Sequence, residues 1–370
     1  MVTIRVPLRE QRDASYDIVV GRGVMAELPG LLARHCPANG YAIISDSLVA
    51  KLYGDRLVGS LHDATLHAQL FTFPAGEWNK TRETWASLSD RMLAAHFGRD
   101  CAVVALGGGV VGDVAGFVAA TYLRGVPYVQ VPTSLLAMID SSIGGKTGVD
   151  VPVGKNLLGA FHQPRLVLAD LDLLASLPAV QLSAGLAEAV KHGVIADAEY
   201  FAFLEREHPA ILAKDAPALE RVVRRSVEIK AAVVTEDERE TGRRAILNFG
   251  HTVGHAIEAT SKFEVLHGEA VAIGMAIETR LAEVLGVATP GTADRVTRLL
   301  ERYRLPVARP EGASVEDLIE AMRGDKKVRG GAIHCALPRG IGSMHGDRGA
   351  GWTVAVAPPR LVEVLAGGDN

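Results

Sequence analysis

The chain has few cysteines, few aromatic residues and no excess of positive charge. Cys36, Cys101 and Cys335 are far apart and form no CxxC pair, which excludes a disulfide framework and a cysteine-rich zinc site. The net charge is −4 and aromatic residues make up 5% of the chain. These values argue against a nucleic-acid partner, because phosphate binding requires a basic surface and base stacking requires aromatic rings.

Long apolar segments are lacking as well. The longest apolar runs, at 102–106 and 271–277, are much shorter than a membrane span. The N-terminal segment carries charges where a signal peptide would have an apolar run. We therefore expect a cytoplasmic protein without a membrane partner. The 370 residues, of which 48% are apolar, are enough for two globular domains.

Apolar runs of strand length alternate with helical patterns in the first part of the chain. We predict strands at Tyr41–Ser45, Ala68–Phe73, Cys101–Leu106, Tyr128–Val131 and Arg165–Ala169, and helices at Thr81–His96 and Val110–Thr121. Asp13–Gly21 is a further strand candidate, at an edge. Such alternation indicates βαβ units on a mostly parallel sheet, whose strand ends are available for a ligand.

The pattern changes after about residue 170. Helical periodicity covers Ser183–Ile195, Ala216–Asp237, Arg244–Ser261 and Gly268–Leu285, and the next strand candidate is Ala332–Leu337. The Gly-rich segment Gly342–Gly351 is expected to be a surface loop. We predict an α/β domain over residues 1–170 and a mostly helical domain over residues 171–370.

A glycine-rich string follows one predicted strand. Gly107 to Asp113 reads GGGVVGD and opens a predicted helix. Glycines at this place allow the backbone to turn tightly and to approach a pyrophosphate at the helix N-terminus. The alternative is a tight strand–helix turn without a ligand, because a GxGxxG match alone is weak.

Charged and polar residues gather in the Gly-, Val- and Leu-rich stretch that follows. They are Arg124, Asp140, Lys146, Lys155 and Asn156. A P-loop is excluded, because Asp140 stands where that motif requires its first glycine. Such charges usually lie on a hydrated loop, but several neighbouring cations also favour a phosphorylated or carboxylated ligand.

Polar residues recur at helical spacing between Arg244 and Glu258. On a continuous helix, a single stripe would contain Arg244, Asn248, His251, His255 and Glu258. The spacing of His251 and His255 suits two metal ligands, and His267 adds a third imidazole. The alternative is that these histidines are hydrogen-bonded core residues. A zinc-protease motif is excluded because Thr252 replaces its glutamate.

Two further segments place charges among apolar residues. Glu188 lies in the string AEAVKHG, where a lone carboxylate would be costly to bury unless it binds a cation. Lys191 shares its helix face, so an internal Glu–Lys pair is the alternative. Lys230 lies on an apolar helical stripe, where a snorkelling lysine and a contact with an anionic substrate both remain open.

Together these motifs resemble the 3-dehydroquinate synthases, within the sugar phosphate cyclases. The similarity extends from about residue 40 to 340. The blocks that carry it are PAGEWNK at 74–80, GGGVVGD at 107–113, PTSLLAMIDSSIGGKT at 132–147, GKN at 154–156, AEAVKHG at 187–193, LNFGHTVGHAIE at 247–258, HGE at 267–269 and DKK at 325–327.

The resemblance implies a Rossmann-like NAD-binding domain and a helical domain for metal and substrate. It implies zinc or cobalt on Glu188, His251 and His267, so that His255 faces the substrate. Contacts with NAD are implied for Asp46, Glu77, Lys80, Gly108, Gly109, Val110, Val111, Gly112, Asp113, Thr133, Ser134, Lys146 and Lys155. Contacts with substrate are implied for Arg124, Asp140, Lys146, Asn156, Lys191, Lys230, Arg244, Asn248, His255 and Lys327, and catalytic roles for His255, Lys146, Lys191, Asn248, Arg244 and Lys230.

The reaction that the resemblance implies belongs to the shikimate pathway. It converts 3-deoxy-D-arabino-heptulosonate 7-phosphate to 3-dehydroquinate and phosphate through NAD-dependent oxidation, phosphate elimination, re-reduction and intramolecular aldol closure. A homodimer is also implied. Alternatives are a sister cyclase that uses sedoheptulose 7-phosphate or glucose 6-phosphate, a metal-dependent polyol dehydrogenase, and a catalytically silent binding protein. Lys230, Arg244, Asn248 and the DKK run at 325–327 are all present, and such partners favour the carboxylated heptulosonate over substrates that lack a carboxylate.

Overall fold

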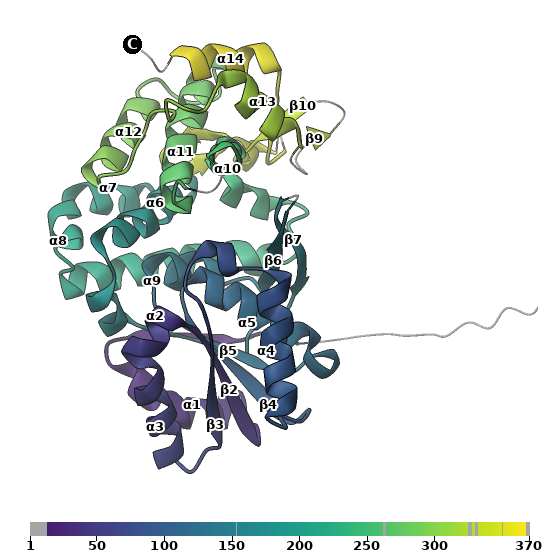
Figure 1. Ribbon diagram of the computed structural model, residues 1–370. Helices are drawn as coiled ribbons and strands as arrows, with labels where there is room; N and C mark the ends of the chain where they lie inside the picture. Colours follow the sequence, from purple (N-terminus) through teal and green to yellow (C-terminus); the bar gives the residue numbers. More distant parts are fainter. Residues whose placement is uncertain are drawn as a thin grey trace, which may run out of the picture.

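The computed structural model describes residues 13–152, 154–261, 264–324, 328–329, 332–349 and 351–367. A sheet with helices on both faces occupies the first part of the chain, and a mostly helical part follows it (Figure 1). This arrangement confirms the expected fold class. The last strand of the sheet ends at Asp170, the residue at which the first predicted domain ends.

Six parallel strands form the main sheet. Their order is β1 (Asp17–Gly21), β8 (Leu166–Asp170), β5 (Tyr128–Pro132), β4 (Cys101–Gly107), β2 (Gly40–Asp46) and β3 (Ala68–Phe73). The central strands β2, β4, β5 and β8 are almost entirely buried, as expected for a parallel sheet covered on both faces. All five predicted strands are present within a residue or two of their expected bounds, and β1 is the predicted edge strand.

Helices cover both faces of this sheet. They are α1 (Leu28–His35), α2 (Ser47–Val49), α3 (Asp55–Asp63), α4 (Arg82–Ala94) and α5 (Gly109–Thr121). Short 3-10 or π turns are η1 (Val24–Glu27), η2 (Ala50–Gly54), η3 (Glu77–Asn79), η4 (Tyr122–Arg124), η5 (Ala137–Ser141) and η6 (Leu171–Ser176). On one face, α4 and α5 enclose a separate apolar cluster, whereas the other face shares its core with the helical part.

An antiparallel hairpin that the sequence did not predict lies beside the main sheet. Strand β6 (Lys146–Val151) pairs with β7 (Gly154–Phe161), and these two strands form a sheet of their own. Most side chains of β7 are exposed, so the segment lacks the apolar alternation that identifies a strand. Lys146, Lys155 and the polar Asn156 therefore lie on a hairpin with defined pairing and not on an irregular loop.

The helical part contains nine helices among the described residues, joined by short strands. The helices are α6 (Ala179–Ala196), α7 (Ala198–Arg206), α8 (His208–Leu212), α9 (Ala216–Glu236), α10 (His251–Thr260), α11 (His267–Val284), α12 (Thr292–Arg302), α13 (Val315–Gly324) and α14 (Pro358–Ala366). The strands are β9 (Val328–Arg329), β10 (Ala332–Cys335), β11 (Pro338–Gly340), β12 (Ser343–Met344) and β13 (Val354–Val356). In the described part of the chain, no helix is both long and apolar enough to cross a membrane.

The continuous helix expected over Arg244–Ser261 is wrong. A 3-10 turn, η7 (Arg243–Asn248), precedes α10, and the chain bends between them at Phe249 and Gly250. Gly250 has a φ of 79°, a left-handed conformation that glycine adopts without steric cost. The polar residues of this region therefore approach one site from two elements instead of forming one stripe.

The surface loop expected at Gly342–Gly351 is also wrong in part. Strand β12 pairs with β11, and a short 3-10 turn, η8 (His345–Arg348), follows it. The carboxylate of Asp347 accepts a hydrogen bond from the backbone N–H of Met344. This local bond gives structure to a segment that composition alone marks as irregular.

Close packing of α10 against α11 positions all three of the predicted site histidines. A Cβ atom at Gly274 would lie 1.9 Å from the carbonyl oxygen of Gly250. We expect Gly274→Ala to lower the free energy of unfolding by about 1–3 kcal/mol, because the two helices must separate. The matched control is Gly59→Ala in α3, where a Cβ meets nothing within 4 Å.

The control should stabilise the protein by roughly 0.5–1 kcal/mol, because alanine favours the helix interior over glycine. Urea denaturation of both variants measures the difference. Equal stability of the two variants would contradict the packing argument.

Candidate active site

The carboxyl ends of strands β2 to β5 form one edge of the main sheet. Strand β4 lies between β2 and β5, whereas β3 lies on the other side of β2. The chain therefore reverses its direction across the sheet between β2 and β4, and such a switch point is where α/β sheets bind ligands. Asp46 ends β2 and Gly107 ends β4, directly at this point.

The glycine string forms the turn from β4 into α5. A Cβ atom at Gly107 would lie 2.4 Å from the side chain of Val111, so the turn requires glycine there. Gly108 is the N-cap of α5, and no side chain caps the helix. The first backbone N–H groups of α5 are therefore available to a pyrophosphate, which fits the predicted dinucleotide.

The other predicted cofactor residues lie at the same edge. Thr133 and Ser134 follow β5, and the N–H of Thr133 donates to the carbonyl of Gly107 at 3.0 Å. Lys80 is buried and forms an ion pair of 2.6 Å with Asp113 of α5. Its ammonium also donates to the side-chain oxygen of Asn156 on β7, which was predicted to contact substrate. The structure thus brings cofactor and substrate candidates together through Lys80.

Three side chains from three helices converge in the helical part. One oxygen of Glu188, on α6, lies 3.5 Å from Nε2 of His251 and 3.5 Å from Nε2 of His267. The three ligand atoms lie within 4.8 Å of one another. Bonds of about 2.1 Å in tetrahedral geometry would separate ligand atoms by roughly 3.4 Å, so this group is preformed for a divalent cation.

The burial and charge of the Glu188 carboxylate show whether a metal fits between the three side chains. Its side chain is fully buried, and neither carboxylate oxygen makes a hydrogen bond of suitable geometry within the described chain. Lys191 forms an ion pair with it from the next turn of α6. Burial alone would raise the pKa of Glu188, but Lys191, His251 and His267 hold it well below its usual range. The carboxylate is therefore charged and ready to bind a cation.

His251 is held with one ring nitrogen toward Glu188. Its Nδ1 lies 3.0 Å from the carbonyl oxygen of Phe249, which favours a proton on Nδ1 and leaves Nε2 as a ligand. Burial and the Lys191 cation lower the pKa of His251 well below its usual value, so the ring is neutral. A metal ligand requires this neutral form.

A residue that the sequence did not indicate fixes the start of α10. Glu278, buried on α11, accepts hydrogen bonds from the N–H groups of Gly250 and Val253 at 2.7 and 3.1 Å. A carboxylate at a helix N-terminus satisfies free N–H groups and favours the helix dipole. Glu278 lies in an ordinary helical pattern, so only the packing of α10 on α11 reveals this role.

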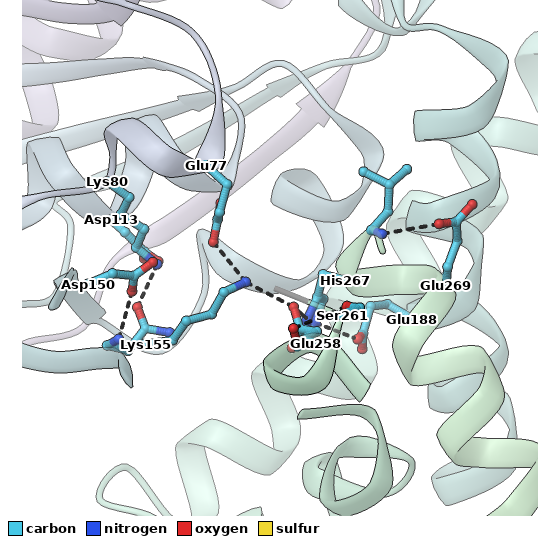
Figure 2. Close-up of polar contacts among 12 residues, drawn as sticks. Glu77, Lys80, Asp113, Asp150, Lys155, Glu188, Glu258, Ser261, His267 and Glu269 are labelled. Carbon is cyan, nitrogen blue, oxygen red and sulfur yellow. Dashed lines mark hydrogen bonds and ion pairs between the residues drawn. The ribbon is translucent and has the colours of Figure 1, made fainter. Parts of the chain in front are cut away.

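His267 begins α11 and lies between two carboxylates (Figure 2). Its Nε2 faces Glu188, and its Nδ1 lies 3.4 Å from an oxygen of Glu258 on α10. Burial would lower the pKa of His267, but the adjacent Glu188 and Glu258 carboxylates raise it to about 10, so a metal must displace the Nε2 proton when it binds. The N–H of Leu266 donates to Glu269 at 3.1 Å, which fixes the start of the helix.

Two buried lysines lie beside the metal candidate. Lys230 of α9 donates to the carboxylate of Asp140 at 2.7 Å, and Lys191 lies 3.8 Å from the same oxygen. Asp140, Glu188 and His192 also have ligand atoms within 4.8 Å of one another. The two ammonium groups next to Asp140 make that second group a poor cation site, because like charges repel.

A further set of polar side chains extends toward the β6–β7 hairpin. Glu240 accepts from Asn248 at 2.5 Å and forms an ion pair with Lys146 of β6. Arg244 is buried and donates to the carbonyl of Gly144 at 3.2 Å. Glu240 was missed by sequence reasoning, because it lies in the charged run DERE, which has the composition of an exposed turn.

Two predicted residues lie outside these groups, and a third lies outside the described residues. Arg124 is exposed in η4, after the C-terminal end of α5, whereas the glycine turn lies at the N-terminal end of that helix. His255 lies one turn after His251, with ring centroids 5.3 Å apart, outside the group of three mutually close ligand atoms. Lys327 lies outside the described residues.

Solved structures of other proteins share this fold. A 2-epi-5-epi-valiolone synthase from Streptomyces hygroscopicus subsp. jinggangensis, solved with NAD+ and Zn2+, is 33% identical, with a TM-score of 0.88 over 98% of this chain and 99% of the other. A 2-deoxy-scyllo-inosose synthase, solved with carbaglucose-6-phosphate, NAD+ and Co2+, is 28% identical, with a TM-score of 0.87 over 95% and 97% of the two chains. The fold is therefore that of the sugar phosphate cyclases.

Family models identify one family within the sugar phosphate cyclases. Residues 70–184 match the N-terminal model of 3-dehydroquinate synthase, and residues 185–328 match its C-terminal model. A 3-dehydroquinate synthase from Symbiobacterium thermophilum is 54% identical over 331 residues, which are 89% of this chain and 92% of the relative. The chain belongs to the 3-dehydroquinate synthase family.

The metal candidate can be tested on the purified chain. We expect Glu188→Gln to lower the affinity for Zn2+ at least about 100-fold, because the buried anionic ligand is lost. His255→Gln should keep the affinity within about threefold of the unsubstituted chain, because His255 lies outside the ligand group. Competition with a chromophoric chelator measures both values. Full zinc occupancy in the Glu188 variant would exclude this ligand set.

Proposed function

We propose that the chain converts 3-deoxy-D-arabino-heptulosonate 7-phosphate into 3-dehydroquinate and phosphate. The observation that carries the proposal is the convergence of buried cations beside the three metal-ligand candidates. Lys191 pairs directly with Glu188, Asp140 links Lys191 to Lys230, and the buried cation of Arg244 lies close enough to act on Lys230. Buried cations near one another suit a substrate that carries both a phosphate and a carboxylate.

The family relationship supports the same substrate. Relatives named 3-dehydroquinate synthase align over most of the chain at 54% identity and below. In the sheet part, the glycine turn, Asp46, Glu77 and Lys80 fit NAD, and in the helical part Glu188, His251 and His267 fit Zn2+ or Co2+. When bound, NAD would accept and return a hydride, and the cation would acidify hydroxyl groups that it contacts.

The side chains of the chain itself would position and protonate the substrate. Lys191, Lys230 and Arg244 would hold its anionic groups, which orients a flexible intermediate for ring closure. Asn248 can donate to a hydroxyl or carboxylate oxygen, and Glu240 fixes its amide. His255, one turn beyond His251, would be within reach to move a proton. Arg124, Lys327, a homodimer and a cytoplasmic location stay predictions.

Product analysis separates this reaction from its rivals. With the heptulosonate phosphate, catalytic NAD and zinc, we expect stoichiometric release of phosphate and formation of 3-dehydroquinate without net NADH, because the hydride returns to the substrate. Sedoheptulose 7-phosphate serves as the second substrate, since it lacks the carboxylate. Turnover with that sugar alone, or accumulation of NADH, would overturn the proposal.

Lys230 gives the reaction an expected pH dependence. Burial, together with the Lys191 and Arg244 cations, lowers the pKa of Lys230 to about 8, although Asp140 opposes the shift. Its positive charge is therefore present below pH 8 and lost as the pH rises through that value. We expect kcat/KM to fall above about pH 8, because this parameter reports the free enzyme.

Lys230→Arg provides the control, because arginine stays protonated throughout this range. In this variant the fall should move to higher pH, while circular dichroism shows the fold intact. A fall at the same pH in the variant would assign the titration to another group.

A further inference from the structure

Glu258 stands in the middle of a chain of charged side chains that crosses from the sheet part to the metal candidate. Its side chain is buried, and the same oxygen, Oε1, lies 3.4 Å from Nδ1 of His267 and 3.0 Å from Nζ of Lys155. Lys155 lies in turn 3.2 Å from Glu77. Figure 2 shows these residues in order, from Glu77 through Lys155 and Glu258 to His267 and Glu188.

The members of this chain come from five separate elements. Glu77 begins η3, after β3 of the main sheet, and Lys155 lies on β7 of the hairpin. Glu258 lies near the C-terminal end of α10, His267 is the first residue of α11, and Glu188 lies on α6. No local periodicity brings these side chains together, so the contacts are a product of how the sheet part meets the helical part.

Burial makes the Glu258 carboxylate dependent on its two partners. The Lys155 ammonium, 3.0 Å away, balances the charge of the carboxylate, and Nδ1 of His267 faces the same oxygen at 3.4 Å. A buried carboxylate without such partners would be costly. Glu258, His267 and Lys155 therefore constrain one another's positions.

A carboxylate on the far nitrogen of a metal-binding histidine fixes the ring orientation and its tautomer. Nδ1 of His267 faces Glu258 and Nε2 faces Glu188, so a bound metal would displace only the Nε2 proton, while the Nδ1 proton stays directed at Glu258. Such a partner also makes the imidazole a stronger ligand. Lys155 fixes the carboxylate itself, because its ammonium lies between Glu258 and Glu77.

We propose that Glu258 is a positioning residue for the metal ligand His267, and that Lys155 tunes metal affinity through Glu258 from the β6–β7 hairpin. The inference deepens the proposed function, because it uses the metal ligands named there. It assigns to Lys155 an effect on the metal site in addition to its predicted contact with the cofactor.

Metal binding by the full-length chain, without NAD or substrate, tests the proposal. Zn2+ affinity is measured by competition with a chromophoric chelator, and the visible spectrum of the Co2+ form reports ligand geometry. Glu258→Gln keeps an oxygen that can accept from Nδ1 but loses the charge, so we expect about a 10-fold loss of affinity. Glu258→Met loses both the accepting oxygen and the charge, so we expect the Zn2+ affinity to fall by a factor approaching about 100 and the Co2+ spectrum to change.

Lys155→Met supplies the second half of the test. We expect a several-fold loss of Zn2+ affinity, smaller than that of Glu258→Met. In the double variant the loss should equal that of Glu258→Met alone, because the lysine acts through the carboxylate. Controls are Lys51→Met and Glu220→Gln, which change exposed side chains of matching type and should leave affinity unchanged.

Circular dichroism and thermal unfolding of each metal-free variant separate loss of folding from loss of metal. Affinity unchanged in Glu258→Met would overturn the positioning role, and full additivity of the two substitutions would overturn the role of Lys155. Turnover is assayed in parallel. A wild-type chain that binds metal but does not release phosphate would refute the proposed function, while the affinity series would still decide this inference.

Discussion

The buried carboxylate of Glu188 is the interaction on which the rest of the site depends. Helix α6 is almost wholly apolar around it, and the side chain is fully buried. A charge in such a place is costly unless cationic groups or hydrogen-bond donors surround it. Lys191 comes from the same helix, whereas His251 and His267 come from two others. The charge of Glu188 is therefore stabilised only when α6, α10 and α11 are correctly placed relative to one another.

Small residues make that placement geometrically feasible. A Cβ atom at Gly268, next to His267, would lie 1.9 Å from the carbonyl oxygen of Ala184 on α6. A Cβ at Gly254 of α10 would lie 3.1 Å from the carbonyl oxygen of Ala270 on α11. The helices can approach this closely only without side chains at these points. Apolar packing thus sets the distances among the polar ligands, and a larger residue at these contacts would displace them.

Much of the fold could be predicted because its signals are local. The buried strands of the main sheet are apolar runs bounded by turn residues, and long helices such as α9 and α11 show clear periodicity. The break at Gly250 could not be predicted in this way, because residues of a 3-10 turn and of an α-helix recur at similar spacing. Tertiary contacts decide where α10 begins, because Glu278 of α11 caps the shortened helix and Met275 packs against Gly250.

The same distinction between local signals and tertiary contacts applies to the residues of the site. Residue types and the family resemblance indicated Glu188, His251 and His267, whereas the carboxylates Glu240, Glu258 and Glu278 acquire their roles only from contacts across the fold. Each of them holds a group that faces the site: Asn248, His267 or the start of α10. An anionic substrate that reaches Lys146 must compete with Glu240, which already pairs with that ammonium. Such internal pairs weaken binding of the anion, but they keep the cations in place before it arrives, so less conformational entropy is lost when it binds.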